Sequence, residues 1–576
     1  MHSAPSYDEP SFAMRWSLGT SLALRNDQSP LPPSKRTKSM LFQTPEFVAL
    51  LLAVFAALAV LKSPRPQQAM LLGASYLFYG WWDVRFLMLL LVSTVVDYSV
   101  ARRMNGAVSW QKRWQLSFWL AAGAVAFLVL PPASNTELRR LAAWIVAGAS
   151  ALPLVIAAVD LIPERSQRRV LLGVSLVTNL GMLGYFKYRD FFAQNYNGLS
   201  GWFGWESSIA PLELALPVGI SFYTFQTLSY TIDVYRGDLQ SERSFRRLAL
   251  YVSYFPQLVA GPIIRPQTFL PTLAKPWTLS ESRFVSGFHL AVVGLVKKVV
   301  IADSIAPLVA VVLDEPAAAT TLSIWMASVL FTVQIYCDFS GYTDIARGVS
   351  RMLGVEIPLN FDAPLLATSM ADFWRRWHIS FSTWLRDYLF LPICGRKPPE
   401  TRVAGAMMAT MLIGGLWHGA GWNYVVWGGY QGVCLCVNRW FGRYLRSHRG
   451  LKSRLQTPAG TLVRWAATMY FTALGMLIFR VHSLEAVLVA IRKFIIFDGE
   501  LGATGAGLGR GAPFQALLMA SLFFLCHFGG RLRGSTWADR LDLIPHRLQP
   551  AFGVFLGAGL FFTWPTAESP FVYFQF

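Results

Sequence analysis

The sequence predicts an all-α, polytopic integral membrane protein, and three observations lead to that prediction. Hydrophobic residues make up 54% of the 576 residues and charged residues only 14%. Apolar runs recur along the whole chain at about the 20-residue length that crosses a bilayer as a helix. Several of these runs contain prolines, which break or kink helices. We therefore expect roughly 11 to 14 membrane segments, some of them re-entrant or broken.

The positions of the basic residues agree with a membrane protein. The formal net charge is +19, and the Lys and Arg residues lie in short clusters between apolar runs, where the positive-inside rule places them. We therefore expect no nucleic-acid partner. The five cysteines are an odd number, lie mostly inside apolar runs and show no paired CxxC spacing. The sequence thus predicts neither a disulfide framework nor a thiolate metal site.

The chain divides into a short polar extension and one membrane domain. Residues 1–39 are rich in Pro and Ser and contain no apolar core long enough for a secretory signal, so we expect them to be disordered. Residues 40–576 form a single predicted membrane domain. Its first helix is expected within the apolar run Leu41–Leu61, and the next segments at 69–80, 84–100, 115–131, 141–162 and 170–186.

The following part of the chain mixes polar side chains into apolar runs. The run that begins at Leu212 contains Ser221, Tyr223, Gln226, Ser229, Tyr230 and Asp233. In a membrane such groups must either hydrogen-bond across helices or face a water-filled cavity, and the sequence leaves both readings open. The next run holds Pro256, Pro262 and Pro266, so it cannot form one helix. We expect this broken segment to be enclosed by protein or to line a cavity.

The later segments carry charges at several places. Segments are expected at 284–312, interrupted by Lys297 and Lys298, and at 320–337, 461–479, 484–497, 513–528 and 551–564. Asp344 and Arg347 have the i,i+3 spacing of a structural ion pair on a helix. The densest basic cluster, from Arg439 to Arg454, should face the cytoplasm. The closing residues F-V-Y-F-Q-F suit a membrane interface.

The stretch Ala371–Gly432 is the strongest candidate for function, because it places His378 and His418 among tryptophans and glycines. An ionisable side chain at membrane depth is costly and usually marks a pathway or a reaction site. We expect the rest of the protein to form the scaffold that holds these two residues.

The first half of this stretch predicts one amphipathic helix over Phe373–Tyr388. At 100° per residue, one face holds Trp374, Trp377, Phe381, Trp384, Leu385 and Tyr388, and the other Arg375, Arg376, Ser380, Thr383, Arg386 and Asp387. His378 lies at the edge of the aromatic face, with Ser382 one turn on and able to hydrogen-bond it. Such a helix fits the membrane interface or the lining of a polar funnel. An interface histidine without chemistry is the alternative for His378.

The second half predicts a helical hairpin. Val403–Trp417 and Trp422–Val437 are apolar pieces separated by His418 and a Gly-Ala-Gly turn, and both outer ends are basic, hence cytoplasmic. Each piece would reach only about 21–24 Å, against a hydrocarbon core of about 30 Å. His418 should then lie deep in the protein as an uncharged imidazole, the state that a general base requires. Two histidines without a third ligand make a poor zinc site.

Six motifs carry a resemblance to a known family. They are V-G-I-S-F-Y-T-F-Q, P-Q-L-V-A-G-P-I, D-F-S-G-Y-T-D, F-W-R-R-W-H-I-S-F-S-T-W-L-R-D-Y, L-W-H-G-A-G-W and the aromatic tail. Together they resemble the membrane-bound O-acyltransferase superfamily, in its bacterial branch of the alginate O-acetylation membrane protein and the teichoic acid D-alanine transfer protein. The match runs from about Met40 to Phe576 and leaves out the N-terminal extension.

The resemblance implies an O-acyltransferase, most simply an acetyltransferase, in the bacterial cytoplasmic (inner) membrane. It gives the essential role to His418 and a second functional role to His378. It also implies a central funnel, which an acyl thioester such as acetyl-CoA enters from the cytoplasm and a hydroxyl of an extracytoplasmic polysaccharide or partner O-acetyltransferase enters from outside. We expect no bound cofactor and no metal. Side chains expected to bind substrate or line the funnel are Trp417, Asn423, Trp374, Trp377, Ser382, Arg386, Asp387, Asp338 and Tyr336.

Two alternatives accompany this interpretation. One is a polytopic transporter or flippase without chemistry, although transporters often show inverted repeats and no such repeat is visible in the chain. The other is a D-alanyl or lipid-directed acyltransferase of the same superfamily.

Overall fold

The computed structural model describes residues 40–106, 136–205, 207–212, 216–496 and 512–532, and a few single positions, among them Phe571. Contacts group Met40–Phe576 into one unit. The predicted disordered extension over 1–39 lies outside the described residues. So do most of the segments predicted at 115–131 and 551–564.

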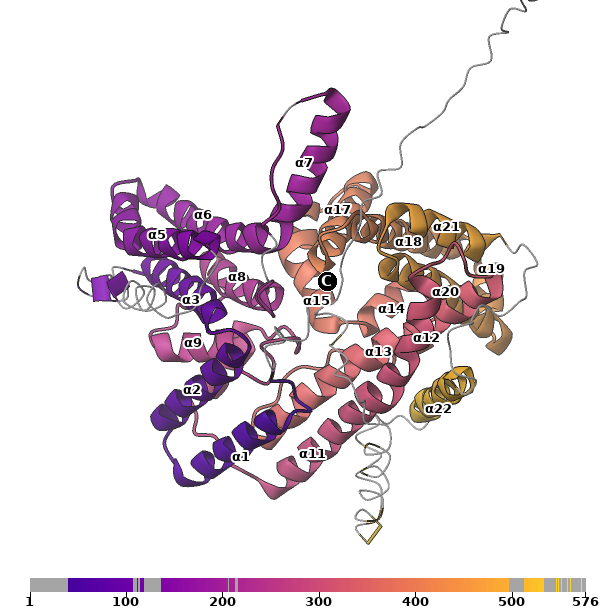
Figure 1. Ribbon diagram of the computed structural model, residues 1–576, viewed down its shortest axis with the longest axis horizontal. Helices are drawn as coiled ribbons and strands as arrows, with labels where there is room; N and C mark the ends of the chain where they lie inside the picture. Colours follow the sequence, from indigo (N-terminus) through magenta and orange to yellow (C-terminus); the bar gives the residue numbers. More distant parts are fainter. Residues whose placement is uncertain are drawn as a thin grey trace, which may run out of the picture. The chain divides into compact units, whose positions relative to one another are not determined.

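The described residues form helices and no strand (Figure 1). The N-terminal part contains α1 (Pro45–Val60), α2 (Pro64–Trp82), α3 (Val84–Met104), α5 (Thr136–Asp160), α6 (Glu164–Leu183), the π-helix η2 (Gly184–Tyr188), α7 (Arg189–Phe203), α8 (Ile220–Arg236), α9 (Phe245–Ser253) and α10 (Pro266–Leu273). The central part contains α11 (Glu281–Leu295), the π-helix η3 (Val296–Ala302), α12 (Asp303–Leu313) and α13 (Thr321–Met352).

The C-terminal part carries the motif-rich stretch. It contains the short 3₁₀-helix η4 (Pro364–Leu366), α14 (Met370–Arg376), α15 (Ile379–Leu385), the π-helix η5 (Arg386–Phe390), α16 (Leu391–Cys394), α17 (Glu400–His418), α18 (Trp422–Ser447), α19 (Arg449–Gln456), α20 (Pro458–Arg480), α21 (Leu484–Ile495) and α22 (Ala512–Leu532). In Figure 1, α15 lies between α8 and α17, and this arrangement brings the candidate site together.

Threonine caps begin three of the long helices. The side-chain oxygens of Thr44, Thr320 and Thr457 accept the backbone N–H three residues on, at 3.4, 3.3 and 3.1 Å. Each cap satisfies one of the N–H groups that a helix start leaves without an intrahelical partner. The local sequence therefore sets where α1, α13 and α20 begin.

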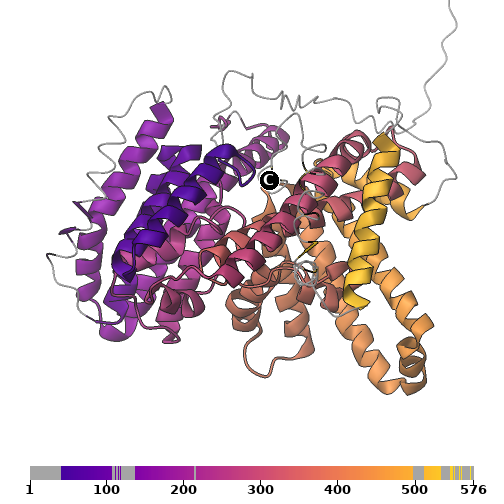
Figure 2. The ribbon, with the colours of Figure 1, turned by 90° about the horizontal axis from the view of Figure 1, so that it is seen from below.

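Glycines let α11 and α13 run side by side in close contact (Figures 1 and 2). A Cβ atom added at Gly294 would meet the carbonyl oxygen of Gly341, and one added at Gly287 would meet that of Gly348 at 2.6 Å. The pairs are spaced seven residues apart on both helices, so the two backbones touch at two successive positions. Small residues serve this purpose between membrane helices.

Three described helical stretches are long and apolar enough to cross a membrane. They are Glu164–Phe203, which joins α6, η2 and α7, Thr321–Met352, which is α13, and Pro458–Arg480, which is α20. The predicted segments at 41–61, 84–100, 170–186, 461–479 and 484–497 correspond to α1, α3, α6, α20 and α21. The break predicted from the prolines is also confirmed, since Tyr254–Ile264 lies buried and non-helical between α9 and α10.

The single helix predicted over Phe373–Tyr388 is wrong. α14 ends at Arg376 and α15 begins at Ile379, because His378 adopts a left-handed backbone with φ of 44° and ψ of 56°. Its aromatic residues are nonetheless buried, and Arg375 and Arg386 are exposed. The expected hydrogen bond between Ser382 and the His378 ring is absent from this described stretch, because the Ser382 hydroxyl donates to the Trp377 carbonyl at 3.2 Å.

The helical hairpin with His418 at its turn is confirmed. α17 ends at His418 and α18 begins at Trp422. The helices are longer than predicted, since α17 starts at Glu400 and has 19 residues, which gives about 28 Å at 1.5 Å per residue. The position of His418 therefore depends on how the helix end is buried, and not on a short helix.

The polar residues of α8 mostly connect helices. Ser229 accepts from the Trp384 indole at 2.8 Å, and Asp233 accepts from the Tyr388 hydroxyl at 2.7 Å. Ser221 instead lines a cavity. Both open readings therefore hold, each for different residues of the run.

Three charges of α13, those of Asp338, Asp344 and Arg347, form buried or half-buried ion pairs. Asp344 pairs with Arg347 at 3.6 Å, as the spacing predicted, and more closely with Lys297 at 2.6 Å. Lys298 pairs with Asp303 and Asp338, both at 2.8 Å. The two lysines that interrupt the predicted segment at 284–312 thus lie on η3 and face carboxylates of α13 and α12.

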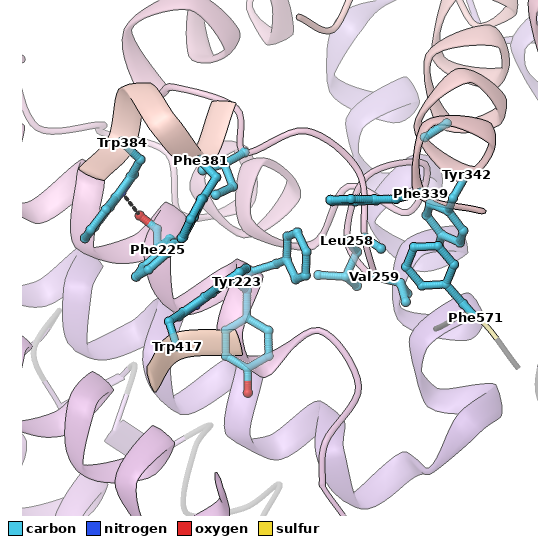
Figure 3. Packing of buried hydrophobic residues seen from close by; sticks show 14 of the residues in the cluster. Tyr223, Phe225, Leu258, Val259, Phe339, Tyr342, Phe381, Trp384, Trp417 and Phe571 are labelled. Carbon is cyan, nitrogen blue, oxygen red and sulfur yellow. Dashed lines mark hydrogen bonds between the residues drawn. The ribbon is translucent and has the colours of Figure 1, made fainter. Parts of the chain in front are cut away.

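Phe571, from the aromatic tail, packs into the core and not at an interface. It is 2% exposed, and its ring centroid lies 4.9 Å from that of Tyr342 and 5.8 Å from that of Phe339 (Figure 3). The expectation that the tail suits a membrane interface is therefore wrong for this residue.

Candidate active site

Two histidines meet at one layer of buried aromatic rings. The Phe381 ring centroid lies 4.9 Å from the His378 imidazole and 5.3 Å from the His418 imidazole. The Trp417 ring also contacts both, at 6.3 and 4.9 Å. Figure 3 shows Phe381 and Trp417 stacked with Phe225 from α8. The two imidazoles, forty residues apart in sequence, thus lie against the same aromatic wall, which Phe381, Trp417 and Phe225 form.

His378 is held in one tautomer by Asn360. The Asn360 Oδ1 atom accepts from the Ser380 backbone N–H at 3.1 Å and from the Ser380 hydroxyl at 2.9 Å, so this atom must be an acceptor. The His378 Nδ1 atom, at 3.2 Å from the same oxygen, must then carry the hydrogen that it donates. In the neutral ring the lone pair therefore lies on Nε2, which is buried without a hydrogen-bond partner among the described residues.

His418 lies at the end of α17 in an aromatic enclosure. It is 5% exposed, and its ring contacts Trp427 at 5.1 Å and Phe479 at 5.3 Å, in addition to Phe381 and Trp417. A small cavity of about 50 Å³ reaches it, lined by Lys187, Leu216, Pro217, Val218, Gly219, Ile220, Ser221, Phe222, Val259, Trp417 and His418. This volume exceeds the space that one water molecule needs, so a small group can approach the imidazole.

A larger cavity lies beside α14, α15 and α17. Its volume is about 430 Å³, and its lining is mostly apolar, with Trp374, Ser382, Thr383 and Arg386 among Ala371, Arg375, Ile379, Leu385, Phe390, Met407, Thr410, Met411 and Leu435. A third cavity of about 390 Å³ shares Ala371, Met407 and Leu435 with it and is lined by Asn438, Arg439, Gly442, Arg443 and Arg446. The two cavities therefore adjoin at these three residues, and one is mostly apolar while the other is lined by arginines.

The other predicted site residues divide between these cavities and structural roles. Trp374, Ser382 and Arg386 line the larger cavity and Trp417 the small one. The remaining five contact protein groups. Trp377 stacks on Phe373 at 5.4 Å, Asn423 donates to the Phe479 carbonyl at 3.5 Å, Asp387 pairs with Arg265 at 3.0 Å, Tyr336 lies 5.3 Å from the His527 ring, and Asp338 pairs with Lys298.

Two residues of the site were missed in the sequence. Asn360 lies eighteen residues before His378, outside any helical spacing, and Lys187 reaches the end of α17 from 230 residues away. The only signal for Lys187 was its place at the end of an apolar run. A lysine at that place is equally expected from the positive-inside rule, without any role in the site. Among the described residues, no group of three His, Cys, Asp or Glu side chains is arranged to hold a metal ion.

The chain matches a family of known proteins. Residues 239–480 match the model of the membrane-bound O-acyltransferase family. The chain is 35% identical over 496 residues to a probable alginate O-acetylase of Pseudomonas aeruginosa, and this match covers 85% of this chain and 82% of that protein.

Two further relatives carry other acyl-transfer names. A peptidoglycan O-acetyltransferase of Helicobacter pylori is 30% identical, with 80% of each chain covered. A teichoic acid D-alanyltransferase of Bacillus subtilis is 29% identical, with 47% of this chain and 70% of that protein covered. The matched region contains both histidines, the aromatic wall apart from its α8 residues, and the larger cavity.

Proposed function

Because the chain belongs to the membrane-bound O-acyltransferase family, and is thus a membrane O-acyltransferase, we propose that it moves an acetyl group from a cytoplasmic thioester to a hydroxyl outside the cytoplasm. The acceptor hydroxyl belongs to an exported polysaccharide or to a periplasmic partner acetyltransferase, as in alginate-type O-acetylation. Acetyl is favoured over D-alanyl because the relatives named as O-acetylases match more of the chain. The protein then works as a multi-pass protein of the bacterial cytoplasmic membrane.

His418 acts as the general base. It removes the proton of the acceptor hydroxyl, whose oxygen forms a bond to the acyl carbon of the thioester. The carbon–sulfur bond then breaks, and the proton passes from His418 to the leaving sulfur, so that the products are an ester and a thiol. A positioned base of this kind contributes about 10²–10⁴ in rate. The observation that carries the assignment is a buried imidazole at the wall of a small cavity.

His378 acts as the second histidine of the site. Its Nδ1–H is fixed on Asn360, and its Nε2 lone pair is left for a hydrogen bond to a reacting group or to a water between the two rings. A direct proton transfer between the two imidazoles is not part of the proposal.

The adjoining large cavities support a route for the acyl donor. Acetyl-CoA joins an uncharged pantetheine arm to several phosphates, and the apolar cavity adjoins one lined by Arg439, Arg443 and Arg446. Phosphates are bound by arginine clusters through charged hydrogen bonds. The basic side should be cytoplasmic, which agrees with a cytoplasmic donor and an acceptor that arrives beside the turn between α17 and α18.

The test is acetyl transfer by the purified protein. Radiolabel from acetyl-CoA is expected to appear in covalent linkage on the acceptor with the wild type and to fall by at least about 10²-fold with His418→Ala. The exposed His448→Ala, far from the aromatic wall, is the control and should transfer at the wild-type rate. Full transfer by His418→Ala in a protein that is present in the membrane would refute the base. Movement of an acceptor without covalent label would support a transporter.

A further inference from the structure

Two neighbouring side chains of η2 hold the last three carbonyls of α17. The Lys187 ammonium donates to the Trp417 carbonyl at 2.6 Å and to the His418 carbonyl at 3.0 Å. The Tyr188 hydroxyl donates to the Leu416 carbonyl at 2.7 Å. These carbonyls belong to the turn that carries His418, and the donors come from the helix that joins α6 to α7.

Helix physics explains why this turn needs partners. The last four carbonyls of an α-helix have no intrahelical donor, and leaving them buried and unpaired costs free energy. The negative end of the helix dipole also lies here, so a cation is favoured. Gly419, which follows His418, has an extended backbone with φ of −161°, and the helix therefore lacks the usual closing turn of C-terminal caps. Lys187 and Tyr188 take the place of such a cap.

We propose that Lys187 and Tyr188 are positioning residues that fix the His418 imidazole against the acyl-transfer cavity, an inference that rests on His418 as the base. Holding the carbonyls of residues 416–418 fixes the direction of the Cα–Cβ bond of His418, and with it the place of the ring between Phe381 and Phe479. Lys187 also lines the cavity that reaches His418. We call Lys187 and Tyr188 together the clamp. The clamp therefore lies on the side from which a small group approaches His418.

The π-helical form of η2 accounts for two consecutive residues reaching one helix end. In a regular α-helix, neighbouring side chains point about 100° apart. Widening the helix over Gly184–Tyr188 changes that angle, and π-bulges occur frequently at functional sites.

The chain provides matched controls for both contacts. Lys493 on α21 donates to the Ala317 and Ala319 carbonyls at 2.9 and 2.6 Å, so it repeats the ammonium contact far from the histidines. Tyr430 on α18 donates to the Phe471 carbonyl at 2.7 Å and repeats the hydroxyl contact. Replacing Lys493 tests what a lost carbonyl partner costs when no histidine depends on it. Replacing Tyr430 tests the loss of a hydroxyl contact to a carbonyl inside a helix.

The experiment compares kcat and KM for acetyl-CoA in Lys187→Met, Lys187→Arg and Tyr188→Phe with those in Lys493→Met and Tyr430→Phe. Misplacing a reacting group by about 1 Å costs about 10²-fold, so kcat should fall about 10²-fold in Lys187→Met and several-fold in Tyr188→Phe. KM should stay within about twofold of the wild type. Lys187→Arg keeps the charge and should recover most of the rate, while both control variants should keep the wild-type kcat.

Two outcomes would decide against the clamp. A raised KM with unchanged kcat would make Lys187 a substrate contact, and unchanged kinetics in Tyr188→Phe would leave no positioning role for the pair. If Lys187→Met is lost from the membrane, Tyr188→Phe and Lys187→Arg carry the test alone. The proposed function fails separately, through an active His418→Ala. With His418→Ala inactive and Lys187→Met fully active, only the clamp is refuted.

Discussion

The backbone of His378 lies in the left-handed region, with φ of 44°. Histidine adopts this region more often than most residues, but the left-handed conformation still costs conformational free energy. The two residues that follow hold this conformation: Ile379 and Ser380 both donate backbone N–H groups to Asn360, at 2.9 and 3.1 Å. The same asparagine therefore bends the chain and sets the tautomer of the ring.

This conformation decides which substitution can test His378. Asparagine tolerates left-handed backbone better than alanine does, so His378→Asn should reach the membrane in wild-type amount while losing the imidazole. We expect kcat for acetyl transfer to fall about 10²-fold. Steady-state transfer and the amount of folded protein are measured together.

His378→Gly is the matched variant, because it also removes the ring and suits a positive φ. Both variants should be equally slow. A wild-type rate in either one would leave His378 as a helix-breaking residue without a part in the reaction.

Among single residues, the sequence located both histidines but not their partners. His378 and His418 stand out because an ionisable side chain among tryptophans is rare at membrane depth. Asn360 and Lys187 do not stand out, since polar residues near the ends of apolar runs are common. Only their tertiary contacts, across 18 and 230 residues of sequence, show that they belong to the site.

At the scale of elements, the hairpin was predictable and the broken helix was not. Basic residues at both outer ends of α17 and α18 fix their direction through the positive-inside rule. The break between α14 and α15 leaves no such signal, because Trp377 and His378 fit the aromatic face of a continuous helix and neither is proline or glycine. A tertiary hydrogen bond overrode the helical periodicity there.

One prediction concerns the ion pairs between the π-helix η3 and its neighbouring helices. Asp338, expected at first to line a funnel, is 1% exposed and pairs with Lys298, as does Asp303. Removing one partner from a buried ion pair costs about 3–5 kcal/mol, and since Asp303 remains, Asp338→Asn should destabilise by about 3 kcal/mol. Thermal unfolding of the detergent-solubilised protein measures this effect.

The control for this prediction is Glu356→Gln. Glu356 pairs with Arg351 at 2.9 Å on the surface, and such pairs contribute little, so the unfolding temperature should not move. If Asp338→Asn unfolds at the wild-type temperature but loses acetyl transfer, the carboxylate lies on a substrate path and the funnel-lining prediction returns.

For the whole molecule, composition predicted the class, and packing supplied what composition could not. The many apolar runs and the distribution of Lys and Arg require a helical membrane protein. They do not say that α8, α15 and α17 meet, which depends on ring contacts such as Phe225 with Trp384 at 3.9 Å (Figure 3). Nor do they show that the predicted cytoplasmic cluster lines a cavity that adjoins an apolar one.

The donor route proposed along these two adjoining cavities yields a kinetic prediction. Arg446 lines the basic cavity but lies far along α18 from the histidines. Arg446→Gln should therefore raise KM for acetyl-CoA several-fold and leave kcat unchanged, because a contact made equally in the ground and transition states affects only binding.

The salt dependence of the same variant completes the argument. Salt screens exposed charges, with a Debye length of about 8 Å at physiological ionic strength, so raising the salt should weaken binding in the wild type and narrow its difference from Arg446→Gln. Arg449→Gln, on the exposed helix α19 and outside the cavity lining, is the matched control and should change neither constant. An unchanged KM in Arg446→Gln, or a fall in kcat instead, would remove the arginine-lined cavity from the proposed donor route.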